Sequence, residues 1–492
     1  MPRILSARVA TGVAILLVSL AVMIATDSWF TVLDDEAQIA TAAWPPAIET
    51  IKLFSAGPGQ HEHPPLSDVL LHFWLPFARN ATLLRLPSIL LYGAGLLLFA
   101  TMAKQFAGDT AFFNLLVIGA LWPFGFHFGR LAGWYSCTFF AVALVSLTYL
   151  YWLRRPSWNN WLLLISAAAL LVFSNYFGWV ILGLLAIDAI LMLGVRRTFG
   201  YLLTGMVVLM AVYAPLWRVF LQELHSGLDF GASGIATRAV YAAYNFYVLF
   251  VSESVAPWYW QASVFIGLAI VVCVCCACLL LTGSRALAFL VYFAILFLFM
   301  SASGIINAKR LLFISGWLLV PLAVALARNG LPRVVLLGCL LVIAVSGVFG
   351  TVTRRYYASL HFIEPWRLVA LEVVPSIHKG VSVVTNSPSF LFYLNFALTP
   401  EALPGMIEGP DIVFLDVGKT FTGFGGPVLF VRGTNVNAMK ETADAEAWLN
   451  RTCTLLAKDV KLIDADYALK QRYFRHLVEG PNRIVLVHYQ CP

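Results

Sequence analysis

Charged residues are scarce in this 492-residue sequence: they make up 12% of it, whereas a soluble domain carries about 25%. Hydrophobic residues make up 60%, and the mean hydropathy is +0.83. This composition excludes an ordinary soluble enzyme, a nucleic-acid-binding protein and a secreted disulfide scaffold. The net charge of +7 does not indicate a polyanionic partner, because membrane proteins collect Lys and Arg in their cytoplasmic loops.

Nucleotide-binding signatures are missing as well, since neither G-x-G-x-x-G nor G-x-x-x-x-G-K-[ST] occurs. Cysteines number only eight. Four of them fall within residues 273–278 of one apolar run, where their spacing cannot direct four thiolates at one metal ion. Cys453 and Cys491 are the pair in the more polar C-terminal region, and the sequence leaves open whether they form a disulfide.

Long apolar runs fill the first 350 residues. A helix needs about 20 apolar residues to cross a hydrocarbon layer of about 30 Å, and we expect eleven such helices. They lie roughly at 8–26, 83–103, 110–126, 132–153, 159–173, 176–195, 200–221, 261–282, 286–304, 311–328 and 333–350. Two long connections, at about 27–82 and 222–260, lie on one side of this predicted membrane domain.

The placement of charges predicts the orientation. With the N-terminus in the cytoplasm, every inner connection contains Lys or Arg, and Asp109 and Asp188 are the only acids before residue 350 that lie inside. An odd number of helices then places the C-terminal region on the outer face, and the compact loops favour a bacterial inner membrane with a periplasmic C-terminal domain. We expect Asp188 to be solvated or paired with Arg196 or Arg197.

The composition changes near Arg354. Residues 351–492 hold 14 Lys and Arg with 13 Asp and Glu, against 18 and 12 in the first 350. This region is long enough for its own core, and its alternating runs predict a small extracytoplasmic α/β domain. We expect strands at 381–385, 412–417, 428–431 and 484–489, and helices at 366–377, 446–453 and 467–477.

The first outer connection contains two motifs. Asp34, Asp35 and Glu36 directly follow the first apolar run, and since one acid suffices to cap a helix, three favour a general base. The sequence then reads His61-Glu62-His63-Pro64-Pro65. The two histidines around a glutamate suit a divalent metal, and the tandem proline suits a stiff turn against the membrane; both interpretations stay open.

Cations and aromatic residues gather on the same predicted face. The cations open the second, fourth and tenth apolar runs: Arg85, Arg130, Lys309 and Arg310. Any one of them alone could extend its charged end to the membrane interface without binding a substrate. Together with the acids they suit a reaction in which a hydroxyl loses its proton and a phosphate departs, because Arg binds phosphate through two hydrogen bonds. Trp134, Tyr135 and Tyr244 suit either sugar stacking or an interfacial aromatic belt.

The order of these motifs resembles the GT-C superfamily of membrane glycosyltransferases, above all its protein O-mannosyltransferase-like (family 39) and lipid A aminoarabinose-transferase branches. The resemblance is carried by Asp35-Glu36, His63-Pro64-Pro65-Leu66, Arg85-Leu86-Pro87-Ser88, Arg130 with Tyr135-Ser136, and Lys309-Arg310. It covers residues 27–136 well, the other helices by layout and the C-terminal region hardly at all. The sequence departs from the family at Leu311, where tyrosine is usual, and at the doubled Asp34-Asp35.

The resemblance implies a GT-C-like fold and an inverting transfer of a sugar from a polyprenyl-phosphate donor to a hydroxyl of a lipid, glycan or protein at the outer face. It implies Asp35 as the base, supported by Glu36 or Asp34. The implied donor phosphate ligands are Arg85, Arg130, Lys309, Arg310 and His63. Apart from the resemblance, we expect sugar or acceptor contacts from Trp134, Tyr135, Glu62 and Tyr244. A divalent metal at His61, Glu62 or His63 stays an open possibility, and no other cofactor is implied.

A transporter or flippase of a lipid-linked anion is the alternative, since the same outer cations would serve it. The absence of an internal repeat and of paired broken helices argues against it. A non-catalytic sensor is a third alternative, and it would not require the three acids at residues 34–36. The connection at 222–260, which carries Tyr244, either closes over an acceptor or is an ordinary link.

Overall fold

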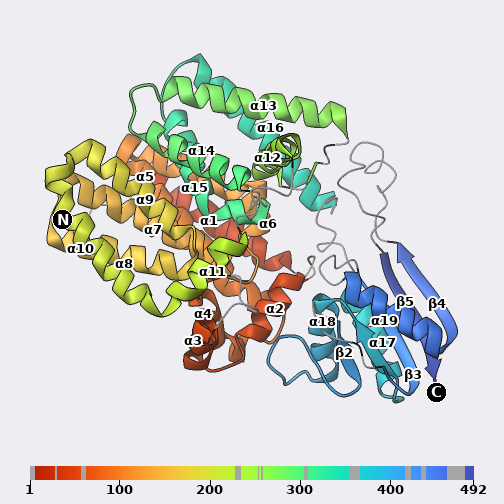
Figure 1. Ribbon diagram of the computed structural model, residues 1–492. Coiled ribbons are helices and arrows are strands. Elements are labelled where there is room, and N and C mark those ends of the chain that lie inside the picture. Colours follow the sequence, from red (N-terminus) through yellow and green to blue (C-terminus); the bar gives the residue numbers. More distant parts are fainter. Residues whose placement is uncertain are drawn as a thin grey trace.

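The computed structural model contains a large helical body and a smaller domain built on a five-stranded sheet (Figure 1). It describes residues 6–27, 30, 32–56, 63–227, 234–252, 254–255, 257, 259–303, 308–353, 366–415, 421, 423–433, 439–462 and 483–492. The helical body comprises α1 (Ala7–Ala25), α2 (Asp34–Ala42), α3 (Ala47–Ala56), α4 (Leu66–Trp74), η2 (Leu75–Phe77), α5 (Ala81–Leu121), α6 (Pro123–Phe128), α7 (Trp134–Arg154), α8 (Trp158–Ser174), α9 (Gly178–Leu193), α10 (Val195–Tyr213), η3 (Ala214–Leu216), α11 (Trp217–Gly227), α12 (Ile235–Val251), α13 (Trp260–Leu280), α14 (Ala286–Ala302), η4 (Ala308–Leu311), α15 (Leu312–Leu326) and α16 (Leu331–Thr353).

All eleven predicted apolar segments are helical for most of their length, although two of them share α5 and the segment at 200–221 covers α10, η3 and part of α11. Within the described residues, seven helices are long and apolar enough to cross a membrane: α1, α5, α7, α10 with its continuation to Gln222, α13, η4 with α15, and α16. Helices α8, α9 and α14 are apolar but have only 16 or 17 residues. The prediction of an α-helical membrane protein with many spans is confirmed.

Helix α5 comprises two predicted segments. The backbone leaves helical geometry at Ala107 and Gly108, and Gly108 has a φ of +71°, which glycine adopts without steric cost. The Tyr92 hydroxyl donates to the Gly119 carbonyl at 3.1 Å, so the second half folds back along the first. The two halves therefore form a helical hairpin at the position of the predicted connection between segments two and three.

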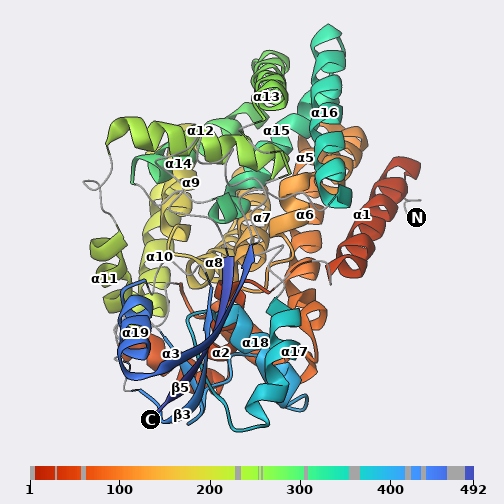
Figure 2. The same cartoon turned by 90° about the vertical axis from the view of Figure 1, so that its right-hand side faces the viewer.

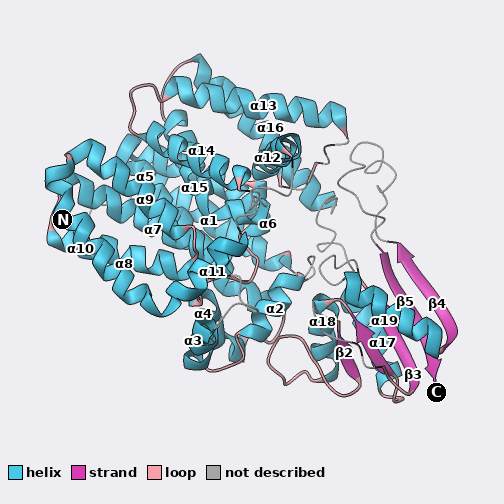
Figure 3. Ribbon diagram, in the orientation of Figure 1, coloured by secondary structure: helices cyan, strands magenta, loops and turns pink. Residues whose placement is uncertain are grey.

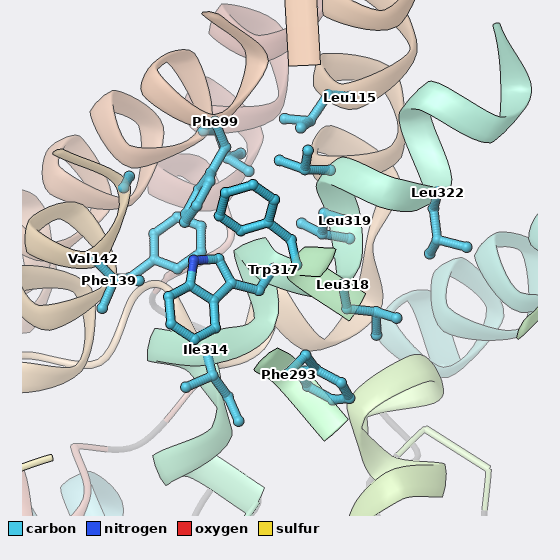
Figure 4. Close-up of a cluster of buried hydrophobic side chains, with 14 of the residues drawn as sticks. Phe99, Leu115, Phe139, Val142, Phe293, Ile314, Trp317, Leu318, Leu319 and Leu322 are labelled. Atoms are coloured by element: carbon cyan, nitrogen blue, oxygen red, sulfur yellow. The ribbon is translucent and has the colours of Figure 1, made fainter. Parts of the chain in front are cut away.

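The core of the helical body lies around α15, whose side chains are buried along its whole length. Phe99 of α5, Phe139 of α7 and Trp317 of α15 meet there (Figure 4). A Cβ atom at Gly316 would lie 2.0 Å from the Phe99 ring, so this glycine lets α15 approach α5 closely. The Trp317 indole donates to Ser146 at 2.8 Å, which satisfies its polar atom inside the core.

The predicted connection at 222–260 is largely helical. It begins in α11, and the apolar helix α12 fills residues 235–251, with Val248 to Val251 buried. Because α12 packs against α14 and α6, most of this segment belongs to the body instead of forming an extended loop.

The sheet domain comprises α17 (Trp366–Ile377), β1 (Ser382–Thr385), α18 (Pro388–Leu398), β2 (Ile412–Phe414), β3 (Gly426–Arg432), α19 (Met439–Thr452), β4 (Thr454–Leu462) and β5 (Arg483–Cys491) (Figure 3). The strand order is β2-β1-β3-β5-β4. Strand β1 runs parallel to β2 and β3, and β5 runs antiparallel to β3 and β4. The predicted α/β domain is thus present, and the predicted helix at 467–477 lies outside the described residues.

Alternating side chains of the sheet enter two separate cores. Leu429 and Leu486 face Trp366 and Phe390 of the helices α17 and α18. Residues on the opposite face, such as Phe430, pack against α19. Cys453 and Cys491 form a disulfide, which decides the alternative that the sequence left open.

The sheet domain touches the body through α18, which packs against α2. Figure 2 shows α18 directly beside α2 from a second direction. Helix α18 was not predicted, although Ser387 caps it by accepting from the Phe390 amide at 3.2 Å and Pro388 occupies its first turn. Serine followed by proline is a helix start signal that could have located it.

Candidate functional site

The acid motif forms the start of α2. The Leu33 amide donates to Glu36 Oε2 at 2.8 Å, so Glu36 closes the first turn of the helix. Asp34 and Asp35 lie in that same turn, where the helix dipole favours negative charge. The side chain of Asp34 lies outside the described residues, so the choice between Asp34 and Asp35 as the base stays open to experiment.

Glu36 is buried, with 1% of its surface exposed, and both oxygens of its carboxylate accept hydrogen bonds from protein groups. Arg85 donates to both oxygens, from Nε to Oε1 at 2.8 Å and from Nη2 to Oε2 at 2.6 Å. The Ala132 amide donates to Oε1 at 2.7 Å. These bonds join α2, the start of α5 and the segment before α7. They favour a structural role for Glu36 over the catalytic role that the resemblance implied.

Asp27 extends this network to a second arginine. Its Oδ1 lies 3.3 Å from Nη1 of Arg85 and 3.6 Å from Nη1 of Arg130, and all three side chains are fully buried. The Arg130 guanidinium also lies 4.3 Å from the centre of the Phe30 ring. We call the two acids and two cations the buried quartet: Asp27, Glu36, Arg85 and Arg130. Because their formal charges cancel, the two arginines are already neutralised and shielded from solvent, an arrangement that does not favour a direct role in phosphate binding.

Asp35, the neighbour of Glu36, lies in a different environment. Its side chain is 43% exposed, and it forms an ion pair with Lys309 Nζ of η4. The Tyr135 hydroxyl donates to Oδ2 of Asp35 at 3.1 Å. Lys309 Nζ lies 5.8 Å from the centre of the Tyr135 ring. The structure thus brings together three of the predicted site residues from α2, α7 and η4.

His63 joins the same group. Its ring lies 4.1 Å from that of Trp134, and the charges of Arg310, Asp35 and Lys309 all act on it. Burial, followed by the nearby Arg310 and Lys309, holds the pKa of His63 well below its usual value, while Asp35 opposes this shift. At neutral pH His63 is therefore uncharged and offers a hydrogen bond instead of the positive charge that the sequence suggested. We call these residues the open cluster: Asp35, His63, Tyr135, Lys309 and Arg310.

The predicted aromatic contacts are less accessible than the sequence suggested. Trp134 and Tyr135 expose only 2% and 3% of their surfaces, and their ring centres lie 4.2 Å apart. Protein covers their faces, so they support His63 and Asp35 instead of presenting an open platform for a sugar. Tyr244 is half-buried on α12, which packs against η4, the turn that carries Lys309 and Arg310.

The possible metal ligands His61 and Glu62 lie outside the described residues. In the part of the chain that the structure describes, no group of three or more His, Cys, Asp or Glu is arranged to hold a metal ion. The metal possibility at the His61-Glu62-His63 motif therefore stays a prediction.

Asp68 is a buried acid that the sequence analysis did not single out. It lies on α4, exposes 7% of its surface and accepts from Ser67 at 3.3 Å. Burial raises its pKa to about 7, and the Ser67 hydrogen bond reduces that shift. Asp68 and Asp27 are both single acids next to apolar runs. This apolar context is the sequence feature that could have identified them as buried acids.

Asp188 lies among helices far from the acid motif. It contacts the Tyr149 hydroxyl and Arg285, at the beginning of α14. The expectation that Asp188 is solvated or paired with Arg196 or Arg197 was wrong. The residue is buried, and because α9 packs against α14, Arg285 lies beside its carboxylate.

Comparisons with known proteins identify the fold. The sequence matches no known protein family and no curated protein. The structure matches the crystal structure of ArnT from Cupriavidus metallidurans bound to undecaprenyl phosphate, with a TM-score of 0.59 and 14% identity over 97% of each chain. It also matches ArnT from the same organism in the apo state, with a TM-score of 0.54 and 13% identity over 97% of this chain and 98% of the other. The chain has the ArnT fold. ArnT is a lipid A aminoarabinose transferase of the GT-C superfamily, so the fold that the motifs implied is confirmed.

Proposed function

We propose that this protein is a membrane glycosyltransferase that moves a sugar from a polyprenyl-phosphate donor to an acceptor hydroxyl. The observation that carries the proposal is the open cluster, in which an accessible carboxylate is paired with Lys309 and a second cation, Arg310, acts on the neighbouring His63, on an ArnT fold. The ArnT structure that matches along nearly the whole chain is bound to undecaprenyl phosphate, which supports a lipid-phosphate donor. No nucleotide-binding motif competes with this choice of donor.

Asp35 is the general base in this proposal. Its carboxylate takes the proton of the acceptor hydroxyl, and the hydroxyl oxygen attacks the anomeric carbon of the sugar. The bond between that carbon and the phosphate oxygen breaks, and the polyprenyl phosphate leaves with the electron pair. Since a single displacement by one nucleophile inverts the carbon, the sugar changes its anomeric configuration.

Lys309 and Arg310 bind the donor phosphate and stabilise the charge that develops on it. Lys309 forms an ion pair with Asp35. A phosphate competes with the Asp35 carboxylate for this ammonium group, so donor binding frees the base at the moment it is needed. Arg85 and Arg130 act through the buried quartet, where they hold α2, α5 and the segment before α7 together.

The open cluster and the sheet domain lie on the extracytoplasmic side in this proposal, and the membrane is a bacterial inner membrane. The charge pattern of the short connections supports this orientation. The disulfide between Cys453 and Cys491 supports it independently, because disulfides form and persist in oxidising compartments. The acceptor is a lipid, a glycan or a protein hydroxyl.

The test is sugar transfer by purified protein in nanodiscs. A panel of radiolabelled polyprenyl-phosphate sugars is offered together with membrane extract, and label in the acceptor fraction is measured for wild type, Asp35→Asn and Lys309→Ala. Asp109→Asn is the matched control, because Asp109 also forms an ion pair with a lysine, Lys104, at 2.6 Å. We expect transfer by wild type and by the control, and loss of transfer in the other two variants.

If no donor is consumed, yet labelled lipid crosses the bilayer of proteoliposomes, the transferase proposal is wrong and the cations of the open cluster belong to a flippase. Equal transfer by wild type and Asp35→Asn would remove Asp35 from the chemistry and leave Asp34 as the base to test.

A further inference from the structure

Val32 connects the sheet domain to the start of α2. This residue is fully buried and lies two positions before the helix. Its amide donates to the Tyr393 hydroxyl at 2.9 Å, and its carbonyl accepts from the Ser389 hydroxyl at 2.8 Å. Ser389 and Tyr393 are four residues apart on α18, so they lie on one face of that helix. Both backbone polar groups of Val32 are therefore satisfied by side chains of the sheet domain.

The other end of α2 is held by the same domain. Thr41 Oγ1 accepts from the Met406 amide at 2.7 Å, and the Trp44 indole donates to the Pro404 carbonyl at 2.9 Å. A Cβ atom at Gly405 would lie 2.6 Å from the Trp44 ring, so the segment fits closely against α2. Between these two ends, Phe392 of α18 is buried in one apolar cluster with residues of α2. The sheet domain thus contacts α2 before, along and after the helix.

Tyr393 also lies close to the buried quartet. The charges of Arg85, Glu36 and Asp27 all act on its hydroxyl. Burial raises the pKa of Tyr393, so the hydroxyl stays protonated and neutral at physiological pH. The sheet domain and the quartet therefore fix the first turn of α2 from two sides, and Asp35 lies in that turn.

We propose that Ser389 and Tyr393 are positioning residues of the transfer reaction, which they serve by fixing Val32 and thereby the Asp35 carboxylate. The inference rests on the proposed function. A small displacement of a catalytic group lowers the rate strongly, because the reacting atoms must lie within a narrow range of distances and angles. The sheet domain is in this sense part of the site, through its contacts with Val32.

The experiment compares the double variant Ser389→Ala/Tyr393→Phe with two controls in the full-length protein. Ser387→Ala removes the cap of α18 without touching Val32. Tyr489→Phe removes a hydroxyl that donates to Asn450 at 2.8 Å, elsewhere in the same domain. For each protein we would measure kcat and the donor KM, the thermal unfolding temperature, and hydrogen exchange of the backbone amides from Val32 to Glu36.

We expect the double variant to lose about tenfold to a hundredfold in kcat, with the donor KM changed less than about twofold. Hydrogen exchange at Val32 should accelerate in the double variant and stay slow in both controls. A purely structural role predicts that Ser387→Ala lowers kcat as much as the double variant does, and that result would overturn the inference, as would a double variant with the kcat of wild type.

The exchange measurement separates the inference from the proposed function, since it needs no activity. If wild type transfers no sugar from any donor, the proposed function fails, and with it the catalytic consequence of this contact. Exchange at Val32 then still decides whether Ser389 and Tyr393 hold α2 in place. Unchanged exchange in the double variant disproves that contact whatever the activity is.

Discussion

Asp35 and Glu36 are adjacent in the sequence and differ in almost every physical respect. Glu36 is buried and bonded to Arg85 and to two backbone amides, whereas Asp35 is 43% exposed and meets a flexible lysine. Successive residues of a helix point about 100° apart. One of the two side chains therefore faces the packed interior, and the other faces the open cluster.

The comparison shows that one helical turn carries a buried acid and an accessible acid, and the proposed function gives only the accessible one a chemical role. The buried quartet has no net formal charge and holds three segments in place. The open cluster contains a partly exposed ion pair between Asp35 and Lys309. Acidic residues in one motif thus serve different purposes, and substitution of each should have a different signature.

The largest effect should come from Asp35→Asn. We expect kcat to fall about 10²-fold to 10⁴-fold, because the general base is lost. The unfolding temperature should stay within about 2 °C of wild type, since surface ion pairs contribute roughly 0–1 kcal/mol. Transfer assays and thermal unfolding in nanodiscs measure the two quantities. A large fall in unfolding temperature would contradict the separation between the two acids.

Glu36→Gln should show the opposite signature. We expect a loss of about 3–5 kcal/mol in the free energy of unfolding, because the variant leaves the buried quartet with two cations and only one acid. Thermal and denaturant unfolding in detergent measure this loss. The double variant Glu36→Met/Arg85→Met is the control, since it removes both charges and should destabilise less than Glu36→Gln. A stable Glu36→Gln protein without activity would instead assign a chemical role to Glu36.

The effect with the narrowest range of conditions should come from Asp68, a third acid that is buried like Glu36, because it depends on pH. Its pKa rises from 3.8 to about 7 on folding, so the folded protein binds a proton more tightly than the unfolded chain does. Stability from this group is fully present below about pH 4 and falls as the pH rises to about 7, by up to about 4 kcal/mol. Asp68→Asn should remove this dependence.

The measurement for Asp68 is the unfolding temperature of wild type and Asp68→Asn between pH 5 and pH 8. The unfolding temperature of Asp68→Asn should rise relative to that of wild type as the pH rises. Parallel curves would show that the folded protein ionises Asp68 as easily as the unfolded chain does.

Much of the fold could be predicted from the sequence, because a helix is recognised from the apolar residues that recur within a short stretch of the chain. The helices of the body follow from such local patterns, and the observed α17 coincides with the predicted helix at 366–377. The roles within the site could not be predicted in this way. Whether Arg85 binds a phosphate or Glu36 depends on how α5 packs against α2. The sequence pattern does not determine how these two helices pack. The contacts of Ser389 and Tyr393 with Val32 join residues more than 350 positions apart, and no local sequence pattern predicts them.

The distance along the chain between Val32 and Tyr393, 361 positions, also sets an order of events during synthesis. At about 5–20 residues per second, the ribosome reaches Tyr393 roughly 20–70 seconds after Val32. For all of that time the helix that carries Asp35 lacks the hydroxyl groups that hold it. A chain that is still being synthesised therefore lacks the contacts that fix the start of α2, and these contacts form only after the sheet domain has been made and has folded.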